Sequence, residues 1–186
     1  MNELTTHTID SAPEGSKPFM EAATAKYGFT PNLVGALAGS PAALEGYMAV
    51  SAAFGKTSLS AVEQQVVLMT VSNENACTYC MAAHSTVVSN MPDAPEGLLE
   101  ALRAGKPSGD PKLDALAGVA REMVMEDGWL SESTVDAFYA AGYGEAQLLE
   151  VLIGLAQKTI SNYVNHMAHT KLDPAFEAQA WIPAQG

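Results

Sequence analysis

Two cysteines and one histidine are the side chains of this sequence best suited to covalent chemistry. Cys77 and Cys80 are the only 2 cysteines among the 186 residues, and His84 follows the second of them by four positions. On a helix, residues three and four apart share one face, with Cβ atoms about 5–6 Å apart. A disulfide needs Cα atoms roughly 4.4–6.8 Å apart, which one helical turn provides. The spacing therefore predicts a dithiol that can open and close in place beside a base.

The chemistry of such a group depends on which sulfur carries the negative charge. The thiolate is the nucleophile, and a free cysteine with a pKa of about 8.5 is mostly protonated at neutral pH. A helix N-terminus would favour charge at Cys77, whereas the His84 imidazole would favour it at Cys80. Helix position alone selects Cys77 as the attacking thiol. Attack on a peroxide gives a sulfenic acid, which the second thiol converts to a disulfide, and an external dithiol must then reset the pair.

Other interpretations of the same residues stay open. The two thiols and His84 are three soft ligands, so a zinc site completed by His166, His169 or an acid is an alternative. Structural zinc sites usually draw ligands from two separated pairs, and the sequence has no second CxxC. Buried structural cysteines and a non-catalytic helical oligomer or binding module are further alternatives. We expect a redox pair that needs neither a metal nor another cofactor.

The elements that position these residues are predicted to be helices throughout. Proline and serine starts, stretches rich in Ala, Leu, Met and Glu, and closing glycines recur along the chain. No segment shows the period-two alternation of a strand. The predicted fold is all-α, with a short turn from 173 and with helices over 18–27, from 31, 41–54, from 60, through the cysteine pair to about 90, 95–104, 110–127, 131–142 and 145–169.

The helix before the cysteines has the clearest start signal. Ser60 and Glu63 form the pattern of a capping box, in which each side chain bonds the other's backbone amide. The residues that follow are apolar on most sides, so this helix is expected to be buried. It delivers the chain to Cys77.

A weak internal repeat has an offset of 85 residues. It superposes Cys77 on Asn162, Cys80 on Asn165 and Gln65 on Glu150. One interpretation is two related helical halves, of which only the first carries thiols; the other is two buried helices of similar composition that align without being related.

Composition limits the classes of partner. The net charge is -12 with only 9 basic residues, which argues against nucleic acid and anionic membranes. Charged residues make up 16% against the usual ~25%, so we expect surface to be buried in a homo-oligomer. Residues 1–17 have no apolar core run, so we expect a flexible segment, neither secretory signal nor anchor, before a single helical domain over 18–186. We predict a cytoplasmic protein, in a compartment that keeps thiols reduced.

Two stretches resemble a known family. Residues 59–67 (LSAVEQQVV) and 75–85 (NACTYCMAAHS) are similar to the alkylhydroperoxidase D-like (AhpD-like) members of the carboxymuconolactone decarboxylase family. The resemblance implies an AhpD-like helical bundle that forms trimers or hexamers and acts as an antioxidant thiol-dependent peroxidase or disulfide oxidoreductase. It implies Cys80 as the attacking thiol and Cys77 as the resolving one. It also implies a hydroperoxide substrate and, as reductant, a lipoyl or other dithiol carrier or a peroxiredoxin-like partner. The family's decarboxylases lack the cysteine pair, so that activity is not implied.

The chain departs from the family at one position. These peroxidases usually place a glutamate twelve residues before the first cysteine as part of a proton relay, and this chain has Gln65 there. A glutamine cannot take up a proton, so activation of Cys80 is expected to depend mainly on His84. Glu63 is a second candidate for the relay, although its capping role is favoured. Glu74 and Glu150 are further acids that folding could bring near, and the repeat ranks Glu150 first.

Overall fold

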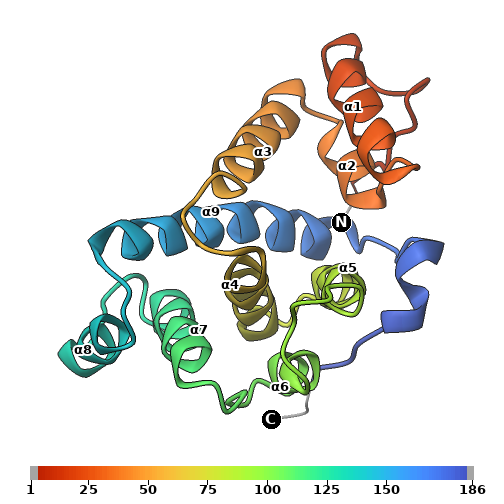
Figure 1. The fold of residues 1–186 in the computed structure, drawn as a ribbon. Coiled ribbons are helices and arrows are strands. Elements are labelled where there is room, and N and C mark those ends of the chain that lie inside the picture. The colour runs from red at the N-terminus through yellow and green to blue at the C-terminus, as the bar shows by residue number, and fades with distance from the viewer. Residues whose placement is uncertain (1–3, 184–186) are drawn as a thin grey trace.

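The computed structural model describes residues 4–183, and the elements it contains there are all helical. The chain runs through a short 3₁₀ turn η1, nine α-helices and a second 3₁₀ turn η2 (Figure 1). Their bounds are η1 Glu14–Ser16, α1 Lys17–Tyr27, α2 Asn32–Leu37, α3 Pro41–Phe54, α4 Ala61–Glu74, α5 Thr78–Val88, α6 Leu98–Ala104, α7 Pro111–Met125, α8 Glu132–Ala140, α9 Glu145–Ala168 and η2 Pro174–Gln179. The all-α prediction is confirmed.

The helices begin and end close to the predicted residues. The small differences follow from the backbone conformation at the helix ends. The helix predicted from 95 begins only at Leu98, because Gly97 takes a left-handed φ of 79° just before it. The helix predicted to reach 127 ends at Met125, since Asp127 and Gly128 both have positive φ values, 52° and 88°. The predicted capping box of α4 is present, with Ser60 accepting from the Glu63 amide and Glu63 accepting from the Ser60 amide.

Helix α9 is the central element of the fold. It crosses the middle of the molecule, with α1, α2 and α3 on one side and α4 to α8 on the other (Figure 1). It packs against α2, α3, α4, α5 and α7. Gly154 allows α9 to lie against Val67 and Phe54, because a Cβ at this position would lie 2.7 Å from Val67 Cγ1 and 2.8 Å from Phe54 Cε2. A glycine in mid-helix thus lets α9 pass directly against α4 and the end of α3.

Buried apolar side chains form two clusters. The larger one is built mainly on α4 and α7, with contributions from α5, α6 and α9. The smaller one joins the N-terminal helices to the start of α5 and contains both cysteines, with Leu33, Val34 and Leu37 among their neighbours. The thiols therefore lie in apolar surroundings between the N-terminal helices and α5.

The N-terminal segment, predicted to be flexible over 1–17, packs on α2 over the part that the structure describes. The His7 amide donates to the Gly35 carbonyl at 3.0 Å, and the buried Ser16 hydroxyl donates to the Ala38 carbonyl at 2.8 Å. Gly35 is required here, since a Cβ would lie 2.7 Å from the His7 carbonyl oxygen. Residues 1–3 lie outside the described residues.

The two predicted halves differ in structure at one place. The break between α4 and α5, at residues 75–77, corresponds under the 85-residue offset to the uninterrupted middle of α9. The repeat stays a prediction.

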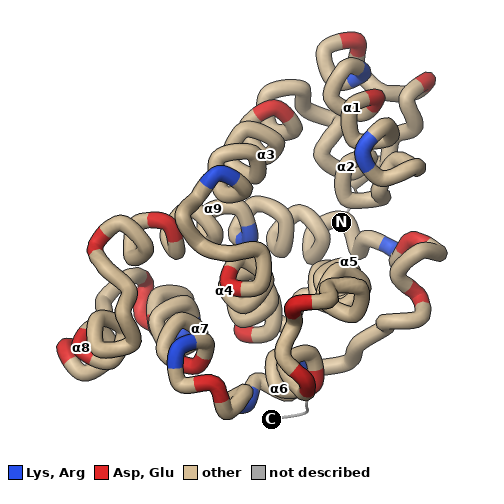
Figure 2. Tube along the Cα trace, in the orientation of Figure 1, with Lys and Arg blue, Asp and Glu red and all other residues tan. Residues whose placement is uncertain are grey.

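Figure 2 shows the Lys and Arg positions distributed along the chain rather than gathered on one element. None of the helices in residues 4–183 is long and apolar enough to cross a membrane.

Candidate active site at the start of helix α5

The cysteine pair occupies the N-terminus of α5. Ala76, directly before it, has a left-handed φ of 50°, an uncommon conformation for a residue with a side chain, and turns the chain out of α4. Cys77 is the N-cap of α5, and Cys80 lies in its first turn. The two are free thiols with exposed fractions of 1% and 2%. Unpaired amides at a helix start favour negative charge, so this position supports a thiolate.

One stripe of α9 faces the thiols. The Asn165 amide nitrogen lies 3.2 Å from Cys80 Sγ, within donor distance, and 3.9 Å from Cys77 Sγ. Ser161 Oγ lies 3.8 Å from Cys80 Sγ. Lys158, one turn earlier on the helix, is 1% exposed and completes the stripe. Cys80 thus receives more polar contacts than Cys77.

His84 connects Lys158 to Gln65. Its Nδ1 lies 2.9 Å from Gln65 Oε1, and its Nε2 lies 3.0 Å from Lys158 Nζ. An ammonium group has no lone pair, so Nε2 must accept from Lys158, and the proton of a neutral ring then sits on Nδ1 and is donated to Gln65. The contacts therefore assign one tautomer, in which the basic nitrogen of His84 faces Lys158.

The pKa values of the two thiols are shifted in opposite directions. Burial alone would raise the pKa of Cys80, but the hydrogen bond from Cys77, the charge of Lys158 and hydrogen bonds from Lys158 and Ser161 hold it well below its usual range. The pKa of Cys77 is raised, first by its hydrogen bond to Cys80 and then by burial. These opposite directions favour the thiolate at Cys80 and the protonated thiol at Cys77.

His84 is a neutral base in this setting. Burial, followed by the charge of Lys158, lowers the pKa of its imidazole well below the ordinary value. The sequence places Gln65, His84 and both cysteines in one predicted site, and the contacts above connect all of them through α9.

The start of α5 is also fixed from outside the cysteine pair. The Tyr79 hydroxyl donates to Asp173 Oδ2 at 2.5 Å and accepts from the Leu33 amide at 3.4 Å. Asp173, 4% exposed, accepts from the Asn32 amide at the first residue of α2. Tyr79 therefore links α5 to the start of α2 and to the segment before η2.

The acids considered from the sequence make other contacts. Glu63 accepts from Tyr143 and pairs with Lys112 at 2.9 Å in addition to its capping role. Glu150 accepts from the Ser58 amide and hydroxyl. Glu74 pairs with Arg121 at 2.6 Å. None of these described contacts reaches a thiol.

The histidines offered for a zinc site are exposed, and His169 is the left-handed C-cap of α9. Among residues 4–183, no group of three or more His, Cys, Asp and Glu side chains is arranged to hold a metal ion. Lys158 also contributes a positive charge at the thiols, which helps to lower the pKa of Cys80 and opposes the rise in the pKa of Cys77.

Sequence reasoning missed Lys158 and Ser161. The available signal is the spacing of polar residues at 158, 161 and 165 within the longest helix of the described residues, which places them on one face. The internal repeat singles out Asn165, the residue that bonds Cys80.

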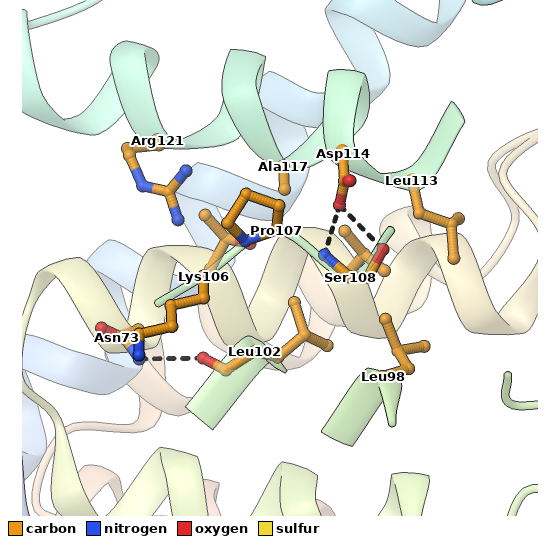
Figure 3. Close-up of a pocket in the computed structure, with 12 residues that line it drawn as sticks. Asn73, Leu98, Leu102, Lys106, Pro107, Ser108, Leu113, Asp114, Ala117 and Arg121 are labelled. Atoms are coloured by element: carbon orange, nitrogen blue, oxygen red, sulfur yellow. Dashed lines mark hydrogen bonds between the residues drawn. The ribbon is translucent and has the colours of Figure 1, made fainter. Parts of the chain in front are cut away.

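A small cavity lies apart from this site, between α4, α6 and α7 (Figure 3). Its volume is about 50 Å³, and none of the thiol-site residues lines it. The Thr70 hydroxyl at its wall is buried and has no hydrogen-bond partner among the described residues.

No protein-family model and no curated protein matches the chain. Solved structures do. The chain aligns over 99% of its length with all of the alkylhydroperoxidase AhpD core protein, an uncharacterized peroxidase-related protein from Ralstonia eutropha JMP134, at a TM-score of 0.82 and 17% identity. A peroxidase-related protein from Silicibacter sp. TM1040 aligns over 96% of both chains at a TM-score of 0.76 and 21% identity.

A third similar structure is a cysteine-to-alanine variant of the debrominase Bmp8 in complex with 2,3,4-tribromopyrrole. It aligns over 96% of both chains at a TM-score of 0.77 and 14% identity. The chain has the AhpD-like fold over nearly its full length, as the motifs around Cys77 and Cys80 predict. The same fold includes peroxidase-related proteins and debrominases.

Proposed function

We propose that this chain is an enzyme, a thiol-dependent peroxidase or disulfide oxidoreductase in which Cys80 attacks and Cys77 resolves. The observation that carries the proposal is the opposite character of two adjacent buried thiols. One has a pKa held well below its usual range and the other a raised pKa. An attacking thiolate beside a protonated partner is what a two-step oxidation to a disulfide requires.

The reaction balances with two electrons taken from the sulfur pair. The Cys80 thiolate attacks the terminal oxygen of a hydroperoxide ROOH, the O–O bond breaks, and Cys80 sulfenic acid and RO⁻ form. Cys77 then attacks the Cys80 sulfur, and water leaves with the Cys77 proton as the disulfide forms. An external dithiol, such as a lipoyl group, returns two electrons and two protons. The acceptor atom Asn165 Oδ1, buried and without a partner among the described residues, is available to the peroxide O–H.

A turnover assay tests this proposal. The wild-type chain should consume alkyl hydroperoxide in the presence of a dithiol reductant, and both Cys77→Ser and Cys80→Ser should lose steady turnover. The Cys80→Ser variant should also lose the first oxidation event, which Cys77→Ser should retain. Turnover that survives in Cys80→Ser would overturn the proposal.

A second candidate is reductive dehalogenation, favoured by the apolar surroundings of the thiols. There the Cys80 thiolate would take bromine from an aryl bromide, the resulting carbanion would take up a proton, and Cys77 would displace bromide to form the same disulfide. Bromide release from 2,3,4-tribromopyrrole with a dithiol, faster than peroxide consumption, would favour this reaction.

A further inference from the structure

We propose that Lys158 is the general acid of this site, giving its proton to the atom that leaves when Cys80 attacks and remaining uncharged once the disulfide has formed. The inference rests on the proposed thiol chemistry and extends it to the proton. It applies to any electrophile whose leaving atom departs as a strong base.

The position of Lys158 carries the argument. Its side chain is 1% exposed, its Nζ lies 3.0 Å from His84 Nε2, and it also contributes a hydrogen bond to the Cys80 thiolate. The three ion pairs described within residues 4–183 join other residues. Lys158 lies on the same face of α9 as Ser161 and Asn165, which lie 3.8 Å and 3.2 Å from Cys80 Sγ. Its charge acts on the three titratable groups of α5 at this site, Cys77, Cys80 and His84. The Cys80 thiolate is therefore the anion that balances this buried ammonium.

Oxidation removes that balance. When Cys80 becomes part of a disulfide its negative charge is gone, and a buried ammonium without a counter-charge is strongly unfavourable. The attack also creates a base, RO⁻, next to the same ammonium. Transfer of one proton from Lys158 Nζ to RO⁻ resolves both problems, and the sum is Cys80–S⁻, Cys77–SH, Lys158–NH₃⁺ and ROOH giving the disulfide, Lys158–NH₂, ROH and H₂O. Charge, atoms and electrons balance.

His84 and Gln65 position this acid rather than compete with it. Because Nε2 accepts from Lys158 while Nδ1 donates to Gln65, the ring aims Nζ without taking part in the bond-breaking step. A glutamine suits this arrangement, since it accepts the Nδ1 proton but does not favour a charged imidazolium. An imidazolium would carry a proton on Nε2 and could no longer accept from Lys158.

The test compares two oxidants with the intact chain and the variants Lys158→Met and Lys56→Met. An alkyl hydroperoxide releases a strongly basic alkoxide, whereas a peracid releases a carboxylate that needs no proton to leave. The measurement is the rate of Cys80 oxidation in a single turnover. Lys158→Met raises the fraction of protonated Cys80 and so slows both oxidants by one common factor. Loss of a general acid slows only the alkyl hydroperoxide further, by about 10²–10⁴-fold.

The ratio of the two rates therefore decides the question. It should fall at least tenfold in Lys158→Met and stay unchanged in Lys56→Met, which alters an exposed lysine. An unchanged ratio in a folded Lys158→Met protein would show that Lys158 only stabilises the thiolate, and would overturn the inference while the proposed function stands. If wild-type Cys80 reacts with neither oxidant, the same comparison with an alkyl and an aryl disulfide decides it, since the alkyl thiolate is the stronger base. Failure of all four reagents overturns function and inference together.

Discussion

At the scale of single residues, the site works by dividing charge between neighbours. In the mechanism we propose, Lys158 is a buried cation, Cys80 its anion, Cys77 a protonated thiol and His84 a neutral acceptor. The family relay that the sequence lacks at Gln65 would need a carboxylate. In the proposed mechanism, a lysine from α9 supplies the proton-donating group, and Gln65 sets the tautomer of the histidine that aims it.

The first prediction at this scale is one thiolate per chain at neutral pH. Because the pKa of Cys80 is held well below its usual range, its thiolate should persist as the pH falls from about 8.5, the ordinary thiol value, through neutrality. The raised pKa of Cys77 should keep that thiol protonated over the same range. Ultraviolet absorbance of the thiolate measures the titration. Cys80→Ser should abolish the neutral-pH signal, and its persistence there would contradict the assignment.

The second prediction concerns Gln65→Glu. A carboxylate at 2.9 Å from His84 Nδ1 should raise the pKa of the imidazole, since an opposite charge at that distance favours the charged form. A charged ring cannot accept from Lys158. The ultraviolet signal of the Cys80 thiolate should therefore change at the pH where the ring becomes charged. Proton NMR of the His84 ring checks the shift. A ring that stays neutral to the same pH as in the wild type would contradict the proposed tautomer.

At the scale of elements, the sequence predicts the helices well and their docking poorly. Ser60, Pro111 and Ser131 mark helix starts through local chemistry that the backbone must satisfy. The partners of Cys80 are Lys158 and Asn165, which lie about eighty residues later in the chain. The polar spacing at 158, 161 and 165 shows that these residues share one face of α9, but packing against α3 and α4 decides that this face turns toward α5.

Gly154 tests that packing. Gly154→Ala would place a methyl group within 3 Å of Val67 and Phe54, and overpacking of this kind lowers the free energy of unfolding by about 1–3 kcal/mol. Gly118→Ala on α7 is the matched control, because nothing lies within 4 Å of its Cβ position, and it should raise stability by roughly 0.5–1 kcal/mol. Denaturant unfolding measures both. Equal effects of the two substitutions would contradict the close approach of α9.

At the scale of the whole molecule, α9 presents an exposed apolar stripe away from the thiols. Leu149, Leu152, Tyr163 and Met167 are 59%, 50%, 55% and 59% exposed. At 3.6 residues per turn they fall within a sector of about 60°, opposite the stripe that faces the cysteines. The sequence predicts oligomerisation from the low charge content, and this stripe is the surface that such contacts would cover.

We therefore predict a homo-oligomer of at least two subunits that buries this stripe. Leu152→Glu should lower the molecular mass measured by light scattering at micromolar concentration, because a carboxylate would be desolvated in the contact. Ala140→Glu, which adds the same charge to an exposed position of α8, should leave the mass unchanged. A monomeric wild-type chain would contradict the prediction.

The most direct test of the central claim is to trap the first oxidation product. One equivalent of hydroperoxide should convert the wild-type chain to an intramolecular disulfide, with a loss of two hydrogen atoms in the intact mass. In Cys77→Ser, a sulfenic-acid reagent should label Cys80. In Cys80→Ser, Cys77 should stay a thiol that can still be alkylated. Labelling of Cys77 in Cys80→Ser, with none of Cys80 in Cys77→Ser, would contradict the account.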